Sequence, residues 1–204
     1  MDGLPSMTYP ASWPNTTKPM MTEISLNVLD VSENSTRAGA SLVTILTNVD
    51  THADKLTIVI ADNGCGMTEE QVDHVTDPFF TTRTTRKVGL GIPFFKFAAE
   101  STGGSFHIES EPGKGTTVTA VFGLSHIDRM PLGDMNATIH NLIVYHPDTD
   151  FIYTYTYNDA SFTLDTREMR EILGGIPLDT PEVSDYIKEY LTENQLETDG
   201  GAQL

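Results

Sequence analysis

Residues 61–92 read ADNGCGMTEEQVDHVTDPFFTTRTTRKVGLGI, and the fold of the chain is decided here. An apolar run ends at Asp62, so its carboxylate is predicted to lie at a strand end, where sheets with helices often place ligands. Such a carboxylate can accept a hydrogen bond from an exocyclic amine such as N6 of adenine. Gly64 and Gly66 follow, and glycine suits positive φ or close approach to a planar ligand. Asp62, Gly64 and Gly66 are therefore predicted to hold an adenine ring.

The second half of the same stretch favours phosphate. Hydroxyl and cationic side chains gather in residues 81–88, and residues 89–91 lead into an apolar helical pattern. Backbone amides at a glycine-rich helix start attract phosphate groups. A single glycine pair is more often an ordinary turn, but the order and spacing of both pairs favour a nucleotide site. The phosphate contacts are expected from Thr81, Thr82, Arg83, Arg86, Lys87, Gly89, Leu90 and Gly91.

Five motifs in this order resemble the boxes of the GHKL superfamily, which joins histidine kinases, DNA gyrase B, Hsp90 chaperones and MutL proteins. They are ENSTRAGA at 33–40, DNGCGM at 62–67, DPFFTT at 77–82, GLGI at 89–92 and GKGTT at 113–117. The resemblance covers residues 23–122, about half of the chain. It implies an α+β fold of the Bergerat type, a two-layer sandwich of a mixed, mostly antiparallel sheet with helices on one face. It also implies ATP and Mg²⁺ as cofactors, and a contact of Thr116 on the adenine side.

Residues 23–38 are predicted to form a helix whose apolar positions share one face. Asp30 and Asn34 lie four residues apart, hence one turn apart on the same side. Asn34 is the expected Mg²⁺ ligand, and Asp30 is the expected catalytic group that orients or deprotonates a water or acceptor hydroxyl. The related ATPases commonly carry glutamate at the position of Asp30, and the shorter aspartate argues against efficient hydrolysis. Glu33 is the weaker candidate for the base.

Local patterns place the remaining elements. We expect a hairpin of 41–47 and 55–61, a short helix at 68–74 capped by Thr68, a helix at 92–102, and strands at 106–110 and 116–122. Beyond residue 122 we expect a second hairpin of 139–145 and 151–157, a strand at 162–164, helices at 165–173 and 181–191, and a polar tail. Tyr153, Tyr155 and Tyr157 share one strand face. Packing against the helices is the favoured interpretation of this stripe, and a docking surface is the alternative.

Composition bounds the classes of protein. Of 204 residues, 38% are hydrophobic, which suffices for a core. The net charge is −17, with 14 acidic and 8 basic residues in 1–123 and 15 and 4 in 124–204. This balance argues against nucleic-acid binding. The single cysteine, Cys65, cannot form an intramolecular disulfide, and neither a membrane span of about 20 apolar residues nor a secretory signal is visible, so a cytoplasmic location is expected.

We expect a disordered leader at 1–20, the ATP-binding domain at 21–123 and an acidic C-terminal extension at 124–204. The sequence leaves open whether the extension continues the ATP-binding sheet or forms its own lobe, and it predicts no oligomeric state. The expected function is a stand-alone Mg·ATP-binding regulatory module, a histidine-kinase-like ATPase or protein kinase that acts on a partner protein through the extension. Two alternatives remain: a non-catalytic ATP-sensing adaptor, and a MutL-like ATPase that dimerises on nucleotide.

Overall fold

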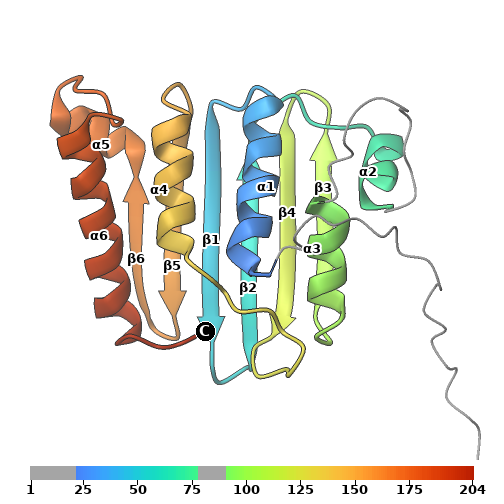
Figure 1. The fold of residues 1–204 in the computed structure, drawn as a ribbon. Coiled ribbons are helices and arrows are strands. Elements are labelled where there is room, and N and C mark those ends of the chain that lie inside the picture. The colour runs from blue at the N-terminus through green and yellow to red at the C-terminus, as the bar shows by residue number, and fades with distance from the viewer. Residues whose placement is uncertain (1–21, 78–90) are drawn as a thin grey trace, which may run out of the picture.

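The computed structural model describes residues 22–77 and 91–204. Within this part the strands form one sheet in the order β3-β4-β2-β1-β5-β6 (Figure 1). The strands are β1 Leu42–Asp50, β2 Lys55–Asp62, β3 Ser105–Glu111, β4 Gly115–Gly123, β5 Asp150–Tyr157 and β6 Ala160–Asp165. The helices are α1 Ile24–Arg37, α2 Glu69–Thr76, α3 Gly91–Glu100, α4 Met135–Tyr145, α5 Thr166–Leu173 and α6 Pro181–Asp199.

The helices α1, α3, α4 and α6 lie over one face of this sheet (Figure 1). Strand residues alternate accordingly: Val43 and Ile45 of β1 are buried beneath the helices, while Thr44 and Leu46 on the opposite face are partly exposed. Apolar side chains of α1, among them Ile24, meet this buried face. The predicted two-layer α+β architecture is therefore confirmed, because one amphipathic sheet face and the apolar helix stripes bury each other.

The C-terminal part continues the sheet. β5 pairs with β1 in parallel, with Ile45 opposite Tyr153, and β6 pairs with β5 antiparallel. β4 runs in the same direction as β5, because β2 is antiparallel to both β4 and β1. Parallel strands need a long crossover connection, and here α4 supplies it. The sequence left open whether the extension continues the ATP-binding sheet, and the structure shows that β5 and β6 do continue it. The domain boundary at residue 123 stays a prediction.

The strand expected at 139–145 is wrong, because these residues belong to α4. Asp134 caps the helix, its side chain accepting a hydrogen bond from the backbone N–H of Ala137 at 2.8 Å. Met135, Ile139 and Leu142 are all buried, and their spacing is helical. The β-branched run from residue 139 hid this pattern, since a short apolar run does not distinguish a strand from a buried helix. The predicted hairpin to β5 is therefore absent.

The polar tail expected after residue 191 is also helical, since α6 continues to Asp199 and stops at Gly200, which has a left-handed φ of 65°. The end of α6 is tied to the sheet: the hydroxyl of Tyr155 donates to Asp199 Oδ2 at 2.9 Å. This tertiary contact stabilises the last turn of α6, whose polar residues alone would not be expected to form a helix. The other predicted elements agree with the structure to within a few residues, including α2, whose capping box joins Thr68 and Gln71.

The tyrosine stripe of β5 packs inward. Tyr153 and Tyr155 are 1% and 0% exposed, and their rings lie 5.9 and 6.0 Å from that of Phe162 on β6. Burial raises the pKa of both phenols above the ordinary value, and for Tyr155 the hydrogen bond to Asp199 acts in the same direction. Both hydroxyls therefore stay protonated at neutral pH. Core packing, the favoured interpretation, explains these two residues.

Candidate functional site

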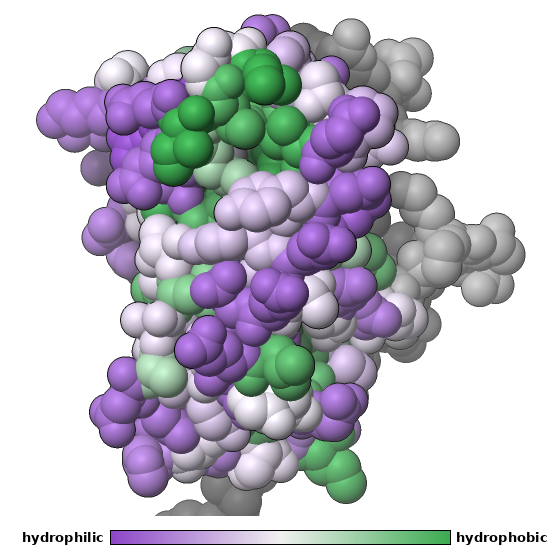
Figure 2. All heavy atoms as spheres, turned by 90° about the vertical axis from the view of Figure 1, so that its left-hand side faces the viewer, coloured by the Kyte–Doolittle hydropathy of each residue, from purple (hydrophilic) through white to green (hydrophobic). Residues whose placement is uncertain are grey.

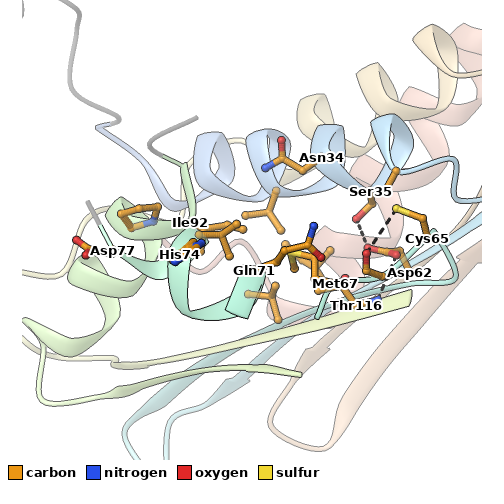
Figure 3. A pocket seen from close by; sticks show the side chains of 17 residues that line it. Asn34, Ser35, Asp62, Cys65, Met67, Gln71, His74, Asp77, Ile92 and Thr116 are labelled. Carbon is orange, nitrogen blue, oxygen red and sulfur yellow. Dashed lines mark hydrogen bonds between the residues drawn. The ribbon is translucent and has the colours of Figure 1, made fainter. Parts of the chain in front are cut away.

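A cavity of about 500 Å³ opens between α1, α2, the start of α3 and the strands β2 and β4. Asp62, Ser35 and Thr116 lie at one end, and His74, Asp77 and other side chains of α2 and α3 lie at the other (Figure 3). Apolar side chains, including those of Val31, Ile60 and Val118, complete the lining. This size and this mixture of an apolar lining with few polar groups are typical of small-molecule sites.

Asp62 is fixed by hydrogen bonds from three directions. Oδ2 accepts from the hydroxyl of Ser35 on α1 at 2.6 Å, and Oδ1 accepts from the backbone N–H groups of Gly64 at 2.9 Å and Thr116 at 3.3 Å. A carboxylate oxygen can accept two hydrogen bonds. Oδ2 therefore keeps one acceptor position, so the last residue of β2 can bind an amine in the cavity.

A second group of hydroxyls supports this end of the cavity. The Ser110 and Thr116 hydroxyl oxygens, from β3 and β4, lie 2.8 Å apart. Ser110 Oγ also donates to the carbonyl oxygen of Gly115 at 3.0 Å and accepts from the N–H of Met67 at 2.8 Å. The hydroxyl of Thr116, expected on the adenine side, is thus held beside the cavity by Ser110, which joins the loop after β2 to two strands.

The glycines after Asp62 allow backbone segments to meet closely. A Cβ on Gly64 would lie 3.0 Å from Ala38. Gly66 has a left-handed φ of 64°, and a Cβ there would overlap the carbonyl oxygen of Glu111 at the end of β3. The glycine pair therefore serves two purposes, since it permits the turn and seats the loop against α1 and β3.

Replacing Gly66 by Ala is expected to destabilise the protein and to weaken ATP binding, because the new methyl group must displace backbone. Gly113→Ala is the matched control: Gly113 has a φ of 77°, yet a Cβ there meets nothing within 4 Å. Gly113→Ala should lower the free energy of unfolding only by the cost of placing alanine in the left-handed conformation, about 1–2 kcal/mol. Gly66→Ala should lower it by more. Urea unfolding and ATP calorimetry on both variants measure this. Equal losses of stability would show that the close approach to Glu111 is unimportant.

Asn34 lines the same cavity from α1 (Figure 3). Its Oδ1 accepts a hydrogen bond from Arg37 Nη1 at 2.9 Å, and Arg37 Nη2 lies 3.4 Å from Glu33 Oε2. Glu33 in turn contacts His146 Nε2, 2.8 Å from its Oε1. Glu33 is thus held by the loop that follows α4, away from the cavity, as expected for the weaker base candidate. A cation that coordinated Asn34 Oδ1 would compete with the positive charge of Arg37 at this oxygen.

Asp30 lies one turn before Asn34 and faces the first residue of α3. A Cβ on Gly91 would overlap Asp30 Oδ2, so only glycine leaves room for the carboxylate here. Oδ2 is buried, and among the described residues it has no hydrogen-bond partner. Such an acceptor beside a helix N-terminus can take a proton or a hydrogen bond from a ligand. The structure therefore brings Asp30 and Gly91 together, but neither is among the residues that line the cavity. The catalytic role expected for Asp30 stays a prediction.

The remaining phosphate contacts expected from the sequence lie outside the described residues. These are Thr81, Thr82, Arg83, Arg86, Lys87, Gly89 and Leu90. Conversely, the cavity and its supports include side chains that the sequence analysis did not select: Ser35, Ser110, Met67, Gln71 and His74. Ser35 follows Asn34 directly in the ENS motif, which could have drawn attention to it. The others carry no comparable sequence signal.

The described residues contain neither a cluster of metal-binding side chains nor a membrane-spanning helix. Across residues 22–77 and 91–204, no group of three or more His, Cys, Asp or Glu side chains is placed to hold a metal ion. A magnesium ion that is bound mainly by nucleotide phosphates and water does not require such a group. Over the same residues, no helix is long and apolar enough to cross a membrane.

Known proteins resemble this chain in sequence over part of its length. Sporulation kinase D of Bacillus subtilis (strain 168) is 36% identical over 109 residues, 53% of this chain and 21% of that protein. A putative sensor protein of Shewanella frigidimarina (strain NCIMB 400) is 39% identical over 83 residues, 39% of this chain and 13% of that protein. The chain thus matches about a fifth or less of the length of these curated relatives.

The fold comparison agrees. The N-terminal domain of a DNA repair protein superposes with a TM-score of 0.50 at 14% identity, covering 71% of this chain and 52% of that one. At this identity the likeness shows the fold alone. Residues 15–126, more than half of the chain, match the family described as histidine kinase-, DNA gyrase B-, and HSP90-like ATPase. With the Asp62 cavity and the motif order, this match shows that the chain belongs to that family and is an ATP-binding, histidine-kinase-like module.

Proposed function

We propose that the chain is an Mg·ATP-dependent regulatory module that acts on a partner protein as a histidine-kinase-like kinase or slow ATPase. The observation that carries the proposal is the cavity that presents Asp62 Oδ2 at one end and Asn34 on α1 above it. An acceptor for an amine and an amide oxygen for a hard cation are the groups that adenine and a magnesium-bound phosphate require. Asp62, Gly64, Gly66 and Thr116 would bind the adenine end.

The residues present suit magnesium, because Asn34 offers a neutral oxygen ligand. The bound ion would offset the charge of the phosphates. Asn34 would hold it after releasing Arg37, and the start of α3 at Gly91 would offer backbone N–H groups to phosphate. Asp30 would take the proton of the attacking water or acceptor hydroxyl. Residues 81–90 would supply further phosphate contacts through their hydroxyl and cationic groups.

The role on a partner protein rests on the relatives and on the C-terminal part. One of these relatives is named a sporulation kinase and the other a putative sensor protein. Residues 124–204 carry most of the net negative charge, because they contain few basic residues. They end in helices that lie outside the residues matched by the family. A charged segment outside the nucleotide site is suited to select a partner. We therefore assign partner choice to this part.

A non-catalytic ATP sensor is the second candidate, and the short side chain of Asp30 favours it. This carboxylate is one methylene shorter than the glutamate common at this position, and its Oδ2 already lies against Gly91. A shorter base reaches less far towards a phosphate-bound water. In that case the module would bind ATP and change its partner contacts without hydrolysis.

The deciding experiment is titration calorimetry with Mg·ATP, combined with measurement of released phosphate and of molecular mass by light scattering. Binding with phosphate release that is lost in the Asp30→Asn variant supports the catalytic proposal. Binding without release, with or without added candidate acceptor proteins, assigns the sensor function. A doubling of mass on ATP addition assigns the dimerising MutL-like alternative. Absence of binding would overturn the proposal.

A further inference from the structure

An apolar groove lies at the opposite edge of the sheet from β3. It has a volume of about 310 Å³ and is bordered by β6, α5 and α6. Leu164 of β6 lines it and is 2% exposed. On the α6 side, Tyr186 and Tyr190 stand with their rings 6.2 Å apart, and the Tyr190 hydroxyl donates to the carbonyl oxygen of Thr163 at 3.2 Å. The groove is therefore built from ordered side chains of three elements.

The apolar stripe of α5 lines this groove, and its residues Met169 and Leu173 also pack against the core while Ile172 does not. Met169, Ile172 and Leu173 are spaced as neighbours on one helix face and line the groove. Ile172 is 84% exposed, and Tyr186 across the groove is 55% exposed. Figure 2 shows the resulting apolar patch near the top of this side of the molecule, bordered by hydrophilic side chains. An apolar helix stripe of this kind is normally covered.

The charge around the groove restricts what can cover it. Residues 166–199 contain nine acidic and three basic residues. Each of the three bases is already in an ion pair: Arg167 with Asp165, Arg170 with Asp150, and Lys188 with Asp185. Within the part of the chain that the structure describes, Glu168, Glu182 and Glu189 have no such pair. Glu168 lines the groove, and Glu182 and Glu189 lie about one helical turn from Tyr186 on α6, so acidic side chains without an ion pair border the apolar contact.

From this combination we infer that the groove binds a basic amphipathic helix of a partner protein. A helix lying between α5 and α6 would place its apolar stripe on Ile172 and Tyr186, and its Lys and Arg side chains beside these acidic side chains. α5 spans eight residues, about 12 Å, so about two to three turns of the partner make contact. A second copy of this chain is disfavoured as the occupant, because its own net charge of −17 would bring like charges together.

This inference rests on the proposed choice of partner by the C-terminal part, but not on the nucleotide site, which lies across β2 and β4. The probes are three synthetic 14-residue helical peptides: a leucine stripe with lysine elsewhere, the same stripe with glutamate, and a scrambled leucine and lysine sequence without a stripe. Calorimetry on the full chain at physiological salt is expected to show one-to-one binding of the first peptide only. Salt at this level screens charge attraction that lacks an apolar contact.

Ile172→Ser should weaken binding of the leucine–lysine peptide about tenfold or more, because the exposed side chain provides the apolar contact. Ile127→Ser is the matched control, since Ile127 is 93% exposed and does not line the groove. Both variants should bind Mg·ATP as the wild type does, which separates this inference from the nucleotide proposal. Equal affinity of Ile172→Ser and wild type, or equal binding of the scrambled peptide, would overturn it. Self-association that Ile172→Ser abolishes would assign the groove to a second copy instead.

Discussion

The Asp62→Asn variant is expected to bind ATP roughly 10- to 150-fold more weakly than the wild type. The loss corresponds to one hydrogen bond to a charged group, about 1.5–3 kcal/mol. The protein should still fold, because the asparagine Oδ1 can keep the N–H groups of Gly64 and Thr116, and the Ser35 hydroxyl can accept from the new amide instead of donating. The second N–H of the new amide, however, would then face the N6 amine of adenine. Both groups are donors, so no hydrogen bond forms between them.

Calorimetry with ATP and with ITP, which has an oxygen in place of the N6 amine, tests the direction of this effect. Wild type should prefer ATP, and Asp62→Asn should lose that preference, since its amide can donate to the oxygen of ITP. Asp73→Asn on α2 is the control. Asp73 is exposed and does not line the cavity, so this substitution removes the same charge at a site away from the nucleotide. ATP binding of Asp62→Asn at wild-type strength would show that the adenine assignment is wrong.

Asn34→Ala is expected to abolish the gain in ATP affinity that magnesium provides. Removing a group that merely supports a metal ligand typically costs roughly 10- to 100-fold in metal affinity, and removing the proposed ligand itself should cost at least as much. The measurement is ATP affinity with magnesium and with a chelator, for wild type and variant. In the chelator the two proteins should bind ATP alike, because the adenine contacts at Asp62 are unchanged.

Arg37→Ala supplies the control for this experiment. It removes the hydrogen bond to Asn34 Oδ1, and Arg37 is exposed, so the fold should tolerate the change. If Asn34 ligates magnesium, this variant should retain the full magnesium dependence, since the oxygen is then free of its competitor. A magnesium effect that persists in Asn34→Ala, or that disappears in Arg37→Ala, would exclude Asn34 as the ligand.

Local chemistry is what made the first half of the chain predictable. The capping box of Thr68, the alternation of β1 and β2, and the glycines around Cys65 each act within a few residues. Their order along the chain predicted the α+β architecture, and the structure confirms it. The motif spacing also pointed to Asp62 and Asn34, which the fold brings to one cavity.

The sequence by itself thus determined the family, the two-layer architecture and the choice of Asp62 as the polar anchor of the cavity. Tertiary structure alone decided that residues 139–145 are helical, that β5 lies parallel to β1, and that Ser35 and Ser110 support the cavity from distant elements. It also decided that α5 leaves Ile172 exposed beside α6. The physical reason is range: capping, turns and strand alternation are contacts between near neighbours, whereas parallel pairing and the burial of a helix face depend on residues far apart in the chain.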